Sequence, residues 1–349
     1  MRMFQVCTCG EPLQLNEAPT PEPKGTEVLL KVIAAGVCHS DLHLAEGFFD
    51  LGGGKKMSLA DRGMKLPVTL GHENVGEVIA LGPDAKGVKV GQRMLANPWI
   101  GCGQCAACRA GEENLCSTNR HLGISVDGGF ASHVLVPHPR YLIDYAPLSA
   151  SFAGALMCSG LTAYSALKRL TAHAKRGPAL LVGMGGVGMM GLSIARAIFP
   201  HAPIVADIDA GKREAALQAG ASAAYDPADP DARKAIFKVT GGVFAAVDFV
   251  GSEKSLAFAS GALAKGGKVV VTGLLGGNFA TPVAMFPLKA MTIEGTLTGT
   301  LDETNELMAL ARAGKIASPP IRERPLGEAQ AALDDLRGGK VVGRVVLSV

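Results

Sequence analysis

The sequence has little net charge, no long run of basic side chains, no internal repeat and no low-complexity tract. Its 349 residues carry a formal charge of +3, and 19% of them are charged. So small a charge gives no reason to expect nucleic acid or an anionic membrane as a partner. Extended disorder is not expected either, because nearly half of the residues are hydrophobic. A chain of this length can form two domains, each with its own core.

The start of the chain also lacks a secretory signal. Residues 1–10 show no basic segment followed by an apolar one, so we expect a cytoplasmic protein. The eight cysteines are then expected in a reducing compartment, where clustered thiols bind metals more often than they form disulfides. Cys7 and Cys9 lie on an expected first strand and receive no role, whereas the others belong to the motifs below.

The pattern of the chain changes near Leu161. Before it, short strands alternate with glycine and proline, which predicts a compact β-rich domain. After it, apolar runs separated by helix-length stretches predict a parallel sheet with helices on both faces. The expected fold class is therefore α/β, and the strand-like tail 341–349 could rejoin the first domain. The expected strands are 27–35, 74–81, 93–96 and 131–136 in the first part, and 179–182, 204–207, 245–249 and 268–272 in the second.

Two glycine-rich stretches need an interpretation. The uncharged residues 178–195 are nearly as long as the roughly 20 residues that span a bilayer. Their five glycines favour a strand, a turn and a helix of a soluble protein instead. The patch Gly52–Lys56 is expected to be an exposed loop.

Residues 180–188 form an apolar run that leads into the pattern G-x-G-x-x-G. The first glycine makes a tight turn, the second lets the backbone approach a pyrophosphate, and the third lets the helix pack on the strand. The helix that follows presents free N–H groups to the phosphates. The residues expected to bind the cofactor here are Gly183, Gly185, Gly186, Val187 and Gly188.

Asp207 ends the next expected strand, at the distance of about 20 residues that this motif uses. Its carboxylate can accept hydrogen bonds from the adenosine ribose and would repel a 2′-phosphate, which favours NAD over NADP. The alternative is that Asp207 only ends the strand or caps the turn at Asp209.

Four cysteines follow one another closely at Cys102, Cys105, Cys108 and Cys116. Four thiolates from one short lobe suit tetrahedral Zn²⁺ and leave no open position, so we expect a structural zinc. An iron–sulfur cluster is the alternative, but the neighbouring residues offer no redox partner.

Three further pieces contain potential metal ligands, namely residues 36–43, 71–73 and 158–160. Each alone has an ordinary explanation. Cys158 could be a small core residue, His72 a polar residue at a strand end, and residues 36–43 a solvated loop.

Together, these pieces, the four-cysteine lobe and the fingerprint resemble the zinc-containing alcohol dehydrogenases of the medium-chain dehydrogenase/reductase family. The resemblance covers essentially the whole chain. It implies a GroES-like catalytic domain, residues 1–158, completed by residues 297–349, and an NAD-binding Rossmann domain, residues 159–296. It also implies two zinc ions per chain and a homodimer or homotetramer.

The resemblance implies a role for each matching residue, in several groups. Cys38, His72 and Cys158 are the implied ligands of the catalytic zinc, and Glu73 is the acid that approaches that metal. Asp41 is the carboxylate that orients the ligand histidine, and Ser40 and His43 relay the proton. His39, Lys212 and Arg344 bind NAD.

The implied chemistry is the oxidation of an alcohol. Two thiolates and a neutral imidazole leave zinc a fourth position, where an alcohol loses its proton easily before hydride passes to the nicotinamide. Trp99, Phe48 and Phe49 are expected to line the cleft, which favours apolar alcohols with their aldehydes or ketones. The segment between His43 and His72 is longer than in many relatives, and this leaves the pocket shape open.

Three alternatives are weighed against this interpretation. A polyol dehydrogenase on the same fold typically has Glu in place of Cys158 and often lacks the four-cysteine lobe. A zinc-free quinone reductase would lack Cys38, His72 and Cys158. A catalytically silent protein that binds NAD and zinc is disfavoured because Ser40, His43, Glu73 and Asp41 are all retained.

Overall fold

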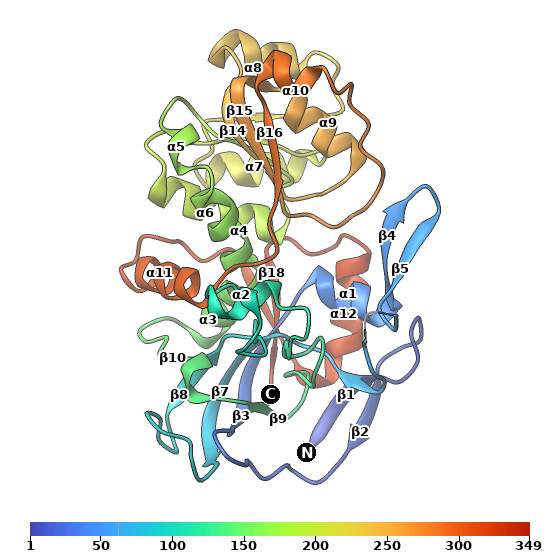
Figure 1. Ribbon diagram of the computed structural model, residues 1–349, viewed down its shortest axis with the longest axis vertical. Helices are drawn as coiled ribbons and strands as arrows, with labels where there is room; N and C mark the ends of the chain where they lie inside the picture. The colour runs from blue at the N-terminus through green and yellow to red at the C-terminus, as the bar shows by residue number, and fades with distance from the viewer. Residues whose placement is uncertain (62) are drawn as a thin grey trace.

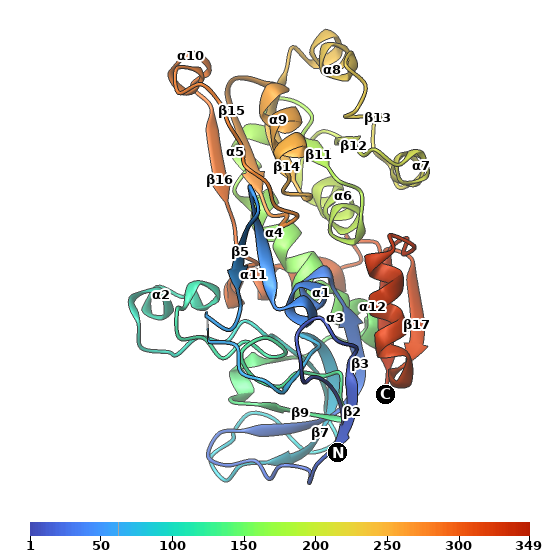
Figure 2. The ribbon, with the colours of Figure 1, turned by 90° about the vertical axis from the view of Figure 1, so that its right-hand side faces the viewer.

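The computed structural model describes residues 1–61 and 63–349. The molecule is elongated and has two halves (Figure 1). Strands dominate the lower half, where both chain termini lie, and the upper half combines strands with most of the helices. Figure 2 shows that a hairpin reaches from the lower half towards the upper half; its strands are β4 (Phe48–Gly52) and β5 (Lys55–Ser58).

The lower half is built around a seven-stranded sheet. The last strand of the chain pairs antiparallel with a strand from the first part, so that Val345 lies opposite Val37. The expected return of the C-terminal tail is thereby confirmed. Across the sheet, the strands are β10 (Leu142–Ile143), β8 (Arg93–Ala96), β7 (Glu73–Leu81), β3 (Val28–Val37), β18 (Arg344–Ser348) and β17 (Ile321–Pro325), with β9 (His133–Val136) also paired to β3. A smaller sheet contains β2 (Gln14–Glu17), β1 (Arg2–Val6) and β6 (Val68–Thr69).

The upper half contains a parallel six-stranded sheet. Its central strands read as continuous apolar runs because both faces are covered, and Leu180, Leu181 and Val182 are all buried. The strands across this sheet are β13 (Ala223–Tyr225), β12 (Ile204–Ala206), β11 (Leu180–Val182), β14 (Val243–Asp248), β15 (Leu263–Val271) and β16 (Thr292–Gly295). The helices of this half are α5 (Thr171–Ala174), α6 (Gly186–Ile198), α7 (Ala210–Gln218), α8 (Ala232–Thr240), α9 (Glu253–Gly261) and α10 (Met285–Lys289).

The strand order fixes where a ligand can bind in this half. The chain runs outward from β11 to β13 and then returns to β14 on the other side of β11. The order therefore reverses between β11 and β14. In open parallel sheets, ligands bind at the carboxyl ends of the strands beside such a reversal.

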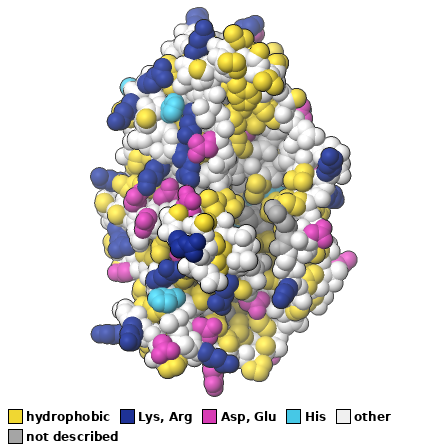
Figure 3. All heavy atoms as spheres, in the orientation of Figure 1, with side chains coloured by type: hydrophobic (Ala, Val, Ile, Leu, Met, Phe, Trp, Pro, Cys, Tyr) yellow, Lys and Arg dark blue, Asp and Glu magenta, His cyan; other side chains and the backbone are white. Residues whose placement is uncertain are grey.

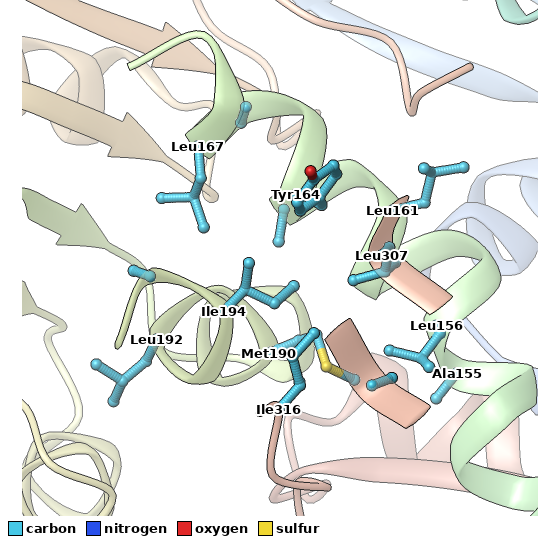
Figure 4. Packing of buried hydrophobic residues seen from close by; sticks show 14 of the residues in the cluster. Ala155, Leu156, Leu161, Tyr164, Leu167, Met190, Leu192, Ile194, Leu307 and Ile316 are labelled. Atoms are coloured by element: carbon cyan, nitrogen blue, oxygen red, sulfur yellow. The ribbon is translucent and has the colours of Figure 1, made fainter. Parts of the chain in front are cut away.

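One apolar helical rod connects the two halves. It consists of α3 (Ala150–Ala155), a π-helical turn (Leu156–Gly160) and α4 (Leu161–Lys168). The rod is long and apolar enough to cross a membrane, but 94% of it is buried inside the protein, as in a core helix. Figure 4 shows Leu161 and Tyr164 of this rod near Ile194 of α6 and Leu307 of α11 (Leu301–Arg312). This packing ties the halves together.

The remaining helices lie in the lower half. They are α1 (His39–Glu46), α2 (Ala106–Arg109) and α12 (Ala329–Arg337), with short 3₁₀ turns at Glu113–Leu115, Pro139–Tyr141 and Leu326–Glu328.

The eight expected strands and the α/β class are confirmed, and residues 178–195 contain strand β11 and most of α6. The expectation of an exposed loop at Gly52–Lys56 was wrong in part. Gly52 is buried, and a Cβ on it would lie 2.5 Å from the backbone of Gly277. The patch forms the end of the β4–β5 hairpin because glycines 52 to 54 all have positive φ, which suits a tight turn. Cys7 and Cys9 follow β1 instead of lying on it.

Candidate active site and metal centres

Cys38, His72 and Cys158 converge from three elements between the two halves. Cys38 stands between β3 and α1, His72 between β6 and β7, and Cys158 in the π-helical turn. The two sulfur atoms are 3.6 Å apart. This separation fits tetrahedral zinc, because Zn–S bonds of about 2.3 Å at the tetrahedral angle hold two sulfurs about 3.8 Å apart. These donors and a Glu73 oxygen all lie within 4.8 Å of one another and are buried.

Asp41 is fully buried and orders this group. One carboxylate oxygen accepts a hydrogen bond from the Cys38 N–H at 2.9 Å. The other lies 3.3 Å from Nδ1 of His72, which directs Nε2 away from Asp41. In the part of the chain that the structure describes, neither His72 ring nitrogen has a hydrogen-bond partner, so Nε2 can bind a metal.

The charges of the group also favour a cation. The hydrogen bond with Cys158 holds the pKa of Cys38 well below its usual range, against the opposing effect of burial, and His72 lowers it further. Burial alone would lower the pKa of His72, but Asp41 and Cys38 raise it well above its usual value. Negative charge is therefore stabilised at Cys38, where a metal would be bound.

Glu73 forms a buried ion pair with Arg344, which donates to both carboxylate oxygens. Burial raises the pKa of Glu73 to about 7, although Arg344 opposes this shift. Only glycine fits at position 36, because a Cβ there would lie 1.9 Å from Glu73. On its other side, Arg344 touches the first turn of α6, where a Cβ on Gly186 would lie 3.0 Å from its Cδ. The ion pair thus links the metal group to the glycine fingerprint.

The expected relay residues lie on α1. Ser40 Oγ is 3.9 Å from the Cys38 sulfur, and His43 is half-buried three residues further along the helix. Burial lowers the pKa of His43, so its ring is neutral near pH 7 and can accept a proton. The ring centroids of His43 and Phe49 are 5.0 Å apart. Phe48 instead lies under the Lys56 ammonium, 3.7 Å from the ring centroid.

Trp99 is buried beside the metal group. Its ring centroid is 5.8 Å from that of His72 and 5.2 Å from that of His121. The indole N–H donates to the carbonyl of Met157 at 2.8 Å, which fixes the ring. Sequence reasoning did not single out His121, since a lone histidine five residues after Cys116 carries no pattern.

The four-cysteine group also has the dimensions of a zinc site. The sulfurs of Cys102 and Cys108 are 3.9 Å apart, those of Cys105 and Cys108 3.4 Å, and those of Cys105 and Cys116 3.8 Å. All four lie within 4.8 Å of one another. Gly101 is required here because a Cβ would lie 2.4 Å from the Cys108 sulfur. The pKa of Cys102 is lowered to about 6, mainly because the Cys102 side chain forms a hydrogen bond with the Gln104 backbone.

Glu113, which sequence reasoning missed, anchors this lobe. Its buried carboxylate accepts hydrogen bonds from the Gly101 N–H at 2.9 Å and the Tyr141 hydroxyl at 2.5 Å. It also forms an ion pair with Arg140 at 2.8 Å. The sequence does place this acidic residue between Cys108 and Cys116, but acidic residues are common in loops, so its position alone did not predict an anchoring role.

The fingerprint glycines have the expected conformations. Gly183 has φ of +91°, which suits the tight turn after β11. A Cβ on Gly188 would lie 1.8 Å from the Gly183 carbonyl oxygen, so helix and strand approach closely there. Around a Cβ on Gly185, by contrast, no described atom lies within 4 Å. Open space therefore faces the start of α6, which begins at Gly186, with Val187 next in its first turn.

Asp207 follows β12 and braces this turn. Its carboxylate accepts from the Met184 N–H at 2.6 Å and from the Asp209 N–H at 2.9 Å. A carboxylate has about four acceptor positions, so some remain for another donor. Arg213 lies beside it, donating to the Asp207 carbonyl at 2.8 Å and pairing with Asp226 at 3.2 Å.

Two expected cofactor residues lie at helix starts. His39 is exposed at the first position of α1, and Lys212 is half-exposed on the first turn of α7. The structure therefore brings the expected metal, relay and fingerprint residues to one region, where α1, the π-helical turn and α6 meet.

Known proteins share both halves of this chain. A family profile described as the alcohol dehydrogenase GroES-like domain matches residues 24–146, and one described as zinc-binding dehydrogenase matches residues 186–313. The NAD-dependent alcohol dehydrogenase of Sulfurisphaera tokodaii is 39% identical over 349 residues, covering 99% of each chain.

Solved structures agree with this result. An alcohol dehydrogenase from Aeropyrum pernix is 30% identical and covers 100% of each chain, with a TM-score of 0.90. A D-arabinose dehydrogenase from Sulfolobus solfataricus is 27% identical, covers 100% of this chain and 99% of its own, and has a TM-score of 0.84. The identity and the nearly complete coverage place this chain in the zinc-containing alcohol dehydrogenase family of the medium-chain dehydrogenases/reductases, which combines a GroES-like domain with a Rossmann-like parallel sheet.

Proposed function

We propose that this protein is a zinc-dependent, NAD-linked alcohol dehydrogenase. It transfers hydride between an apolar primary or secondary alcohol, or the corresponding aldehyde or ketone, and NAD. One observation carries this proposal. A single buried ion pair, Glu73–Arg344, connects the group of Cys38, His72 and Cys158 to the first turn of α6.

Two zinc ions per chain suit the two donor groups. Cys38, His72 and Cys158 provide three ligands and leave a position for substrate, as catalytic zinc sites do. The second group provides four thiolates and no open position, which suits a structural zinc. Its ligands are Cys102, Cys105, Cys108 and Cys116.

NAD suits the space at the start of α6. Gly185 leaves room for a pyrophosphate, and the backbone N–H groups of Gly186, Val187 and Gly188 lie at the positive end of the helix dipole. The free acceptor positions of Asp207 suit the adenosine ribose hydroxyls. Further contacts come from Arg344, Lys212 and His39, of which Arg344 already touches Gly186.

The residues of this chain divide the work of the reaction. When bound, zinc supplies a Lewis acid that acidifies the alcohol hydroxyl, and NAD supplies the hydride acceptor. Asp41 holds His72 in the orientation for metal binding, and Arg344 holds Glu73 close enough to approach the metal. Ser40, beside Cys38, begins the proton relay by giving up its own hydroxyl proton as it accepts that of the substrate, and neutral His43 ends the relay by accepting a proton and releasing it to water.

The substrate pocket is proposed to include Trp99, Phe48 and Phe49. The ring of Trp99 next to His72 supports an apolar wall near the reacting carbon. Because Phe49 packs on His43, it would approach substrate along the relay. A polyol dehydrogenase remains the second candidate, since Trp99 also touches His121, a polar residue.

The proposal extends to the organisation of the protein. A catalytic domain of residues 1–158 and 297–349 encloses a cofactor domain of residues 159–296. Four exposed apolar side chains between β15 and the edge strand β16 support a homodimer or homotetramer, namely Leu274, Leu275, Val283 and Leu288. Figure 3 shows hydrophobic side chains on the upper half of the molecule. Clusters of metal-binding thiols suit the reducing cytoplasm.

The test is the reduction of NAD, followed by absorbance at 340 nm, with primary, secondary, cyclic and aromatic alcohols. The proposal expects activity with NAD that increases from ethanol to longer alcohols, since each buried CH₂ contributes about 0.8 kcal/mol. Protein that contains two zinc ions per chain but oxidises no alcohol would contradict it.

A further inference from the structure

His121 packs against Trp99, which also lies beside His72 of the metal group, and one of its buried ring nitrogens has no partner within the described residues. His121 is only 5% exposed, and its ring makes one hydrogen bond, with the Glu113 backbone. Its other nitrogen, Nε2, has no partner among residues 1–61 and 63–349. Buried polar atoms without partners are rare because they cost free energy, so a ligand that satisfies this atom is expected to bind well.

At this nitrogen the His121 ring is able to accept a hydrogen bond. Burial lowers the pKa of His121 to about 4, so the imidazole is neutral near pH 7. In a neutral imidazole one nitrogen carries hydrogen and the other is an acceptor. The nitrogen that faces the Glu113 backbone carries the hydrogen, since that contact raises the pKa. Nε2 is therefore suited to a donor such as a hydroxyl group.

The position of His121 fits the distal end of a substrate. Trp99 lies beside both His72 and His121, with its ring centroid 5.8 Å and 5.2 Å from theirs. Trp99 meets His121 at an interplanar angle of 82°, and its bond to the Met157 carbonyl prevents it from rotating. A molecule bound at the metal group and packed on Trp99 would therefore lie close to His121.

The segments around His121 carry two more unsatisfied polar atoms. Oδ1 of Asn114 and Oγ1 of Thr298 are buried and have no partner within the described residues. Asn114 follows Glu113, which bonds the His121 ring, and its Nδ2 donates to the carbonyl of Leu297 at 2.7 Å. Three adjoining segments therefore combine polar groups with the apolar face of Trp99.

We propose that His121 is a specificity-determining residue that accepts a hydrogen bond from a second hydroxyl of the substrate, remote from the reacting carbon. This inference rests on the proposed function and narrows its substrates. The preferred class is a short diol or hydroxy-alcohol with an apolar middle that packs on Trp99 and a hydroxyl at each end.

Trp99 itself provides the readout, because it is the single tryptophan of the chain and touches His121. Its fluorescence is recorded while zinc-loaded protein is titrated with pentan-1-ol and with pentane-1,5-diol, which differ by one hydroxyl. Butane and hexane pairs repeat the comparison at other lengths. We expect one diol of the series to bind about tenfold more tightly than its mono-alcohol, which is the upper range for one neutral hydrogen bond.

Three variants separate the acceptor from the shape of the side chain. His121→Gln places an amide oxygen near the position of Nε2 and should retain part of the preference. His121→Asn is too short to reach that position, and His121→Phe fills the volume without an acceptor, so both should bind diol and mono-alcohol equally. Zinc content and the circular dichroism spectrum show that each variant is folded.

The outcomes separate this inference from the proposed function. Equal binding of diols and mono-alcohols by the native protein would overturn the role of His121, and so would a preference that persists in the Asn and Phe variants. These titrations need no turnover. NAD reduction with pentan-1-ol is measured separately, and its failure would contradict the proposed dehydrogenase while the titrations still decide the role of His121.

Discussion

Replacing Glu113 by alanine should loosen the four-cysteine lobe from the rest of the protein. The side chain of Glu113 is 9% exposed and accepts hydrogen bonds from the buried Gly101 N–H and the buried Tyr141 hydroxyl. Each buried donor left without a partner costs about 1–3 kcal/mol, so the two together predict a loss of about 2–6 kcal/mol. Arg140 adds little because its side chain is 46% exposed.

The loss should be visible in the zinc of this lobe. Gly101 directly precedes Cys102, so movement of the 101 backbone displaces a ligand. We expect one zinc per chain to transfer faster to a competing chelator in Glu113→Ala, and the midpoint of chemical denaturation to fall. Glu113→Gln should lie between this variant and the native protein, because its amide keeps an acceptor oxygen. A rate of zinc transfer is preferable to a melting temperature where unfolding is irreversible.

Glu112→Ala is the matched control, since Glu112 is the exposed neighbour of Glu113. A surface substitution of this kind changes stability by about 0.5 kcal/mol or less. The reasoning is refuted if Glu113→Ala and Glu112→Ala release zinc at the same rate and have the same denaturation midpoint.

Five other substitutions test the remaining sites. Cys116→Ala should lose one zinc ion and much stability, whereas Cys158→Ser should lose mainly activity. Metal analysis that finds a single zinc ion in the native protein would contradict the assignment of one structural and one catalytic zinc. Asp207→Gly should weaken the binding of NAD and narrow the preference of the enzyme for NAD over NADP. Adding Asp226→Asn, which frees Arg213 from its ion pair, should favour NADP further. Equal efficiency of the native enzyme with both nucleotides would refute the role of Asp207. His43→Gln should slow alcohol oxidation near neutral pH by at most about 10²–10⁴-fold, because the lowered pKa of His43 keeps the native ring neutral and able to accept a proton. The activity should recover partly at high pH, with both zinc ions still bound. An unchanged pH–rate profile would remove His43 from the relay.

Much of the fold could be predicted from the sequence because its signals are local. Strand β8 has the bounds 93–96 that its apolar pattern indicated, and the fingerprint led into a helix as expected. The four cysteines are close in sequence, so their convergence needs only a short lobe. The hairpin β4–β5 was missed, since its glycines pack against Gly277, far along the chain, and no local pattern reports this contact.

The long-range contacts of the site could not be predicted from the residues alone. Glu73 and Arg344 are 271 positions apart, and Cys158 and Cys38 are 120 apart. Only the family resemblance brought Cys158 into the site, because a single buried cysteine looks like a core residue. Glu113 and His121 have partners set by the folded backbone, so even the resemblance did not identify them.

The central claim is that hydride passes directly from an alcohol carbon to NAD at the site of Cys38, His72 and Cys158. The most direct measurement uses an alcohol that carries deuterium only on its reacting carbon and determines the deuterium content of the reduced nucleotide by mass spectrometry. The account predicts one deuterium in each molecule of NADH formed by the native enzyme, and almost no NADH from Cys158→Ser protein that still holds its second zinc. NADH without deuterium, or equal transfer by Cys158→Ser, would contradict it.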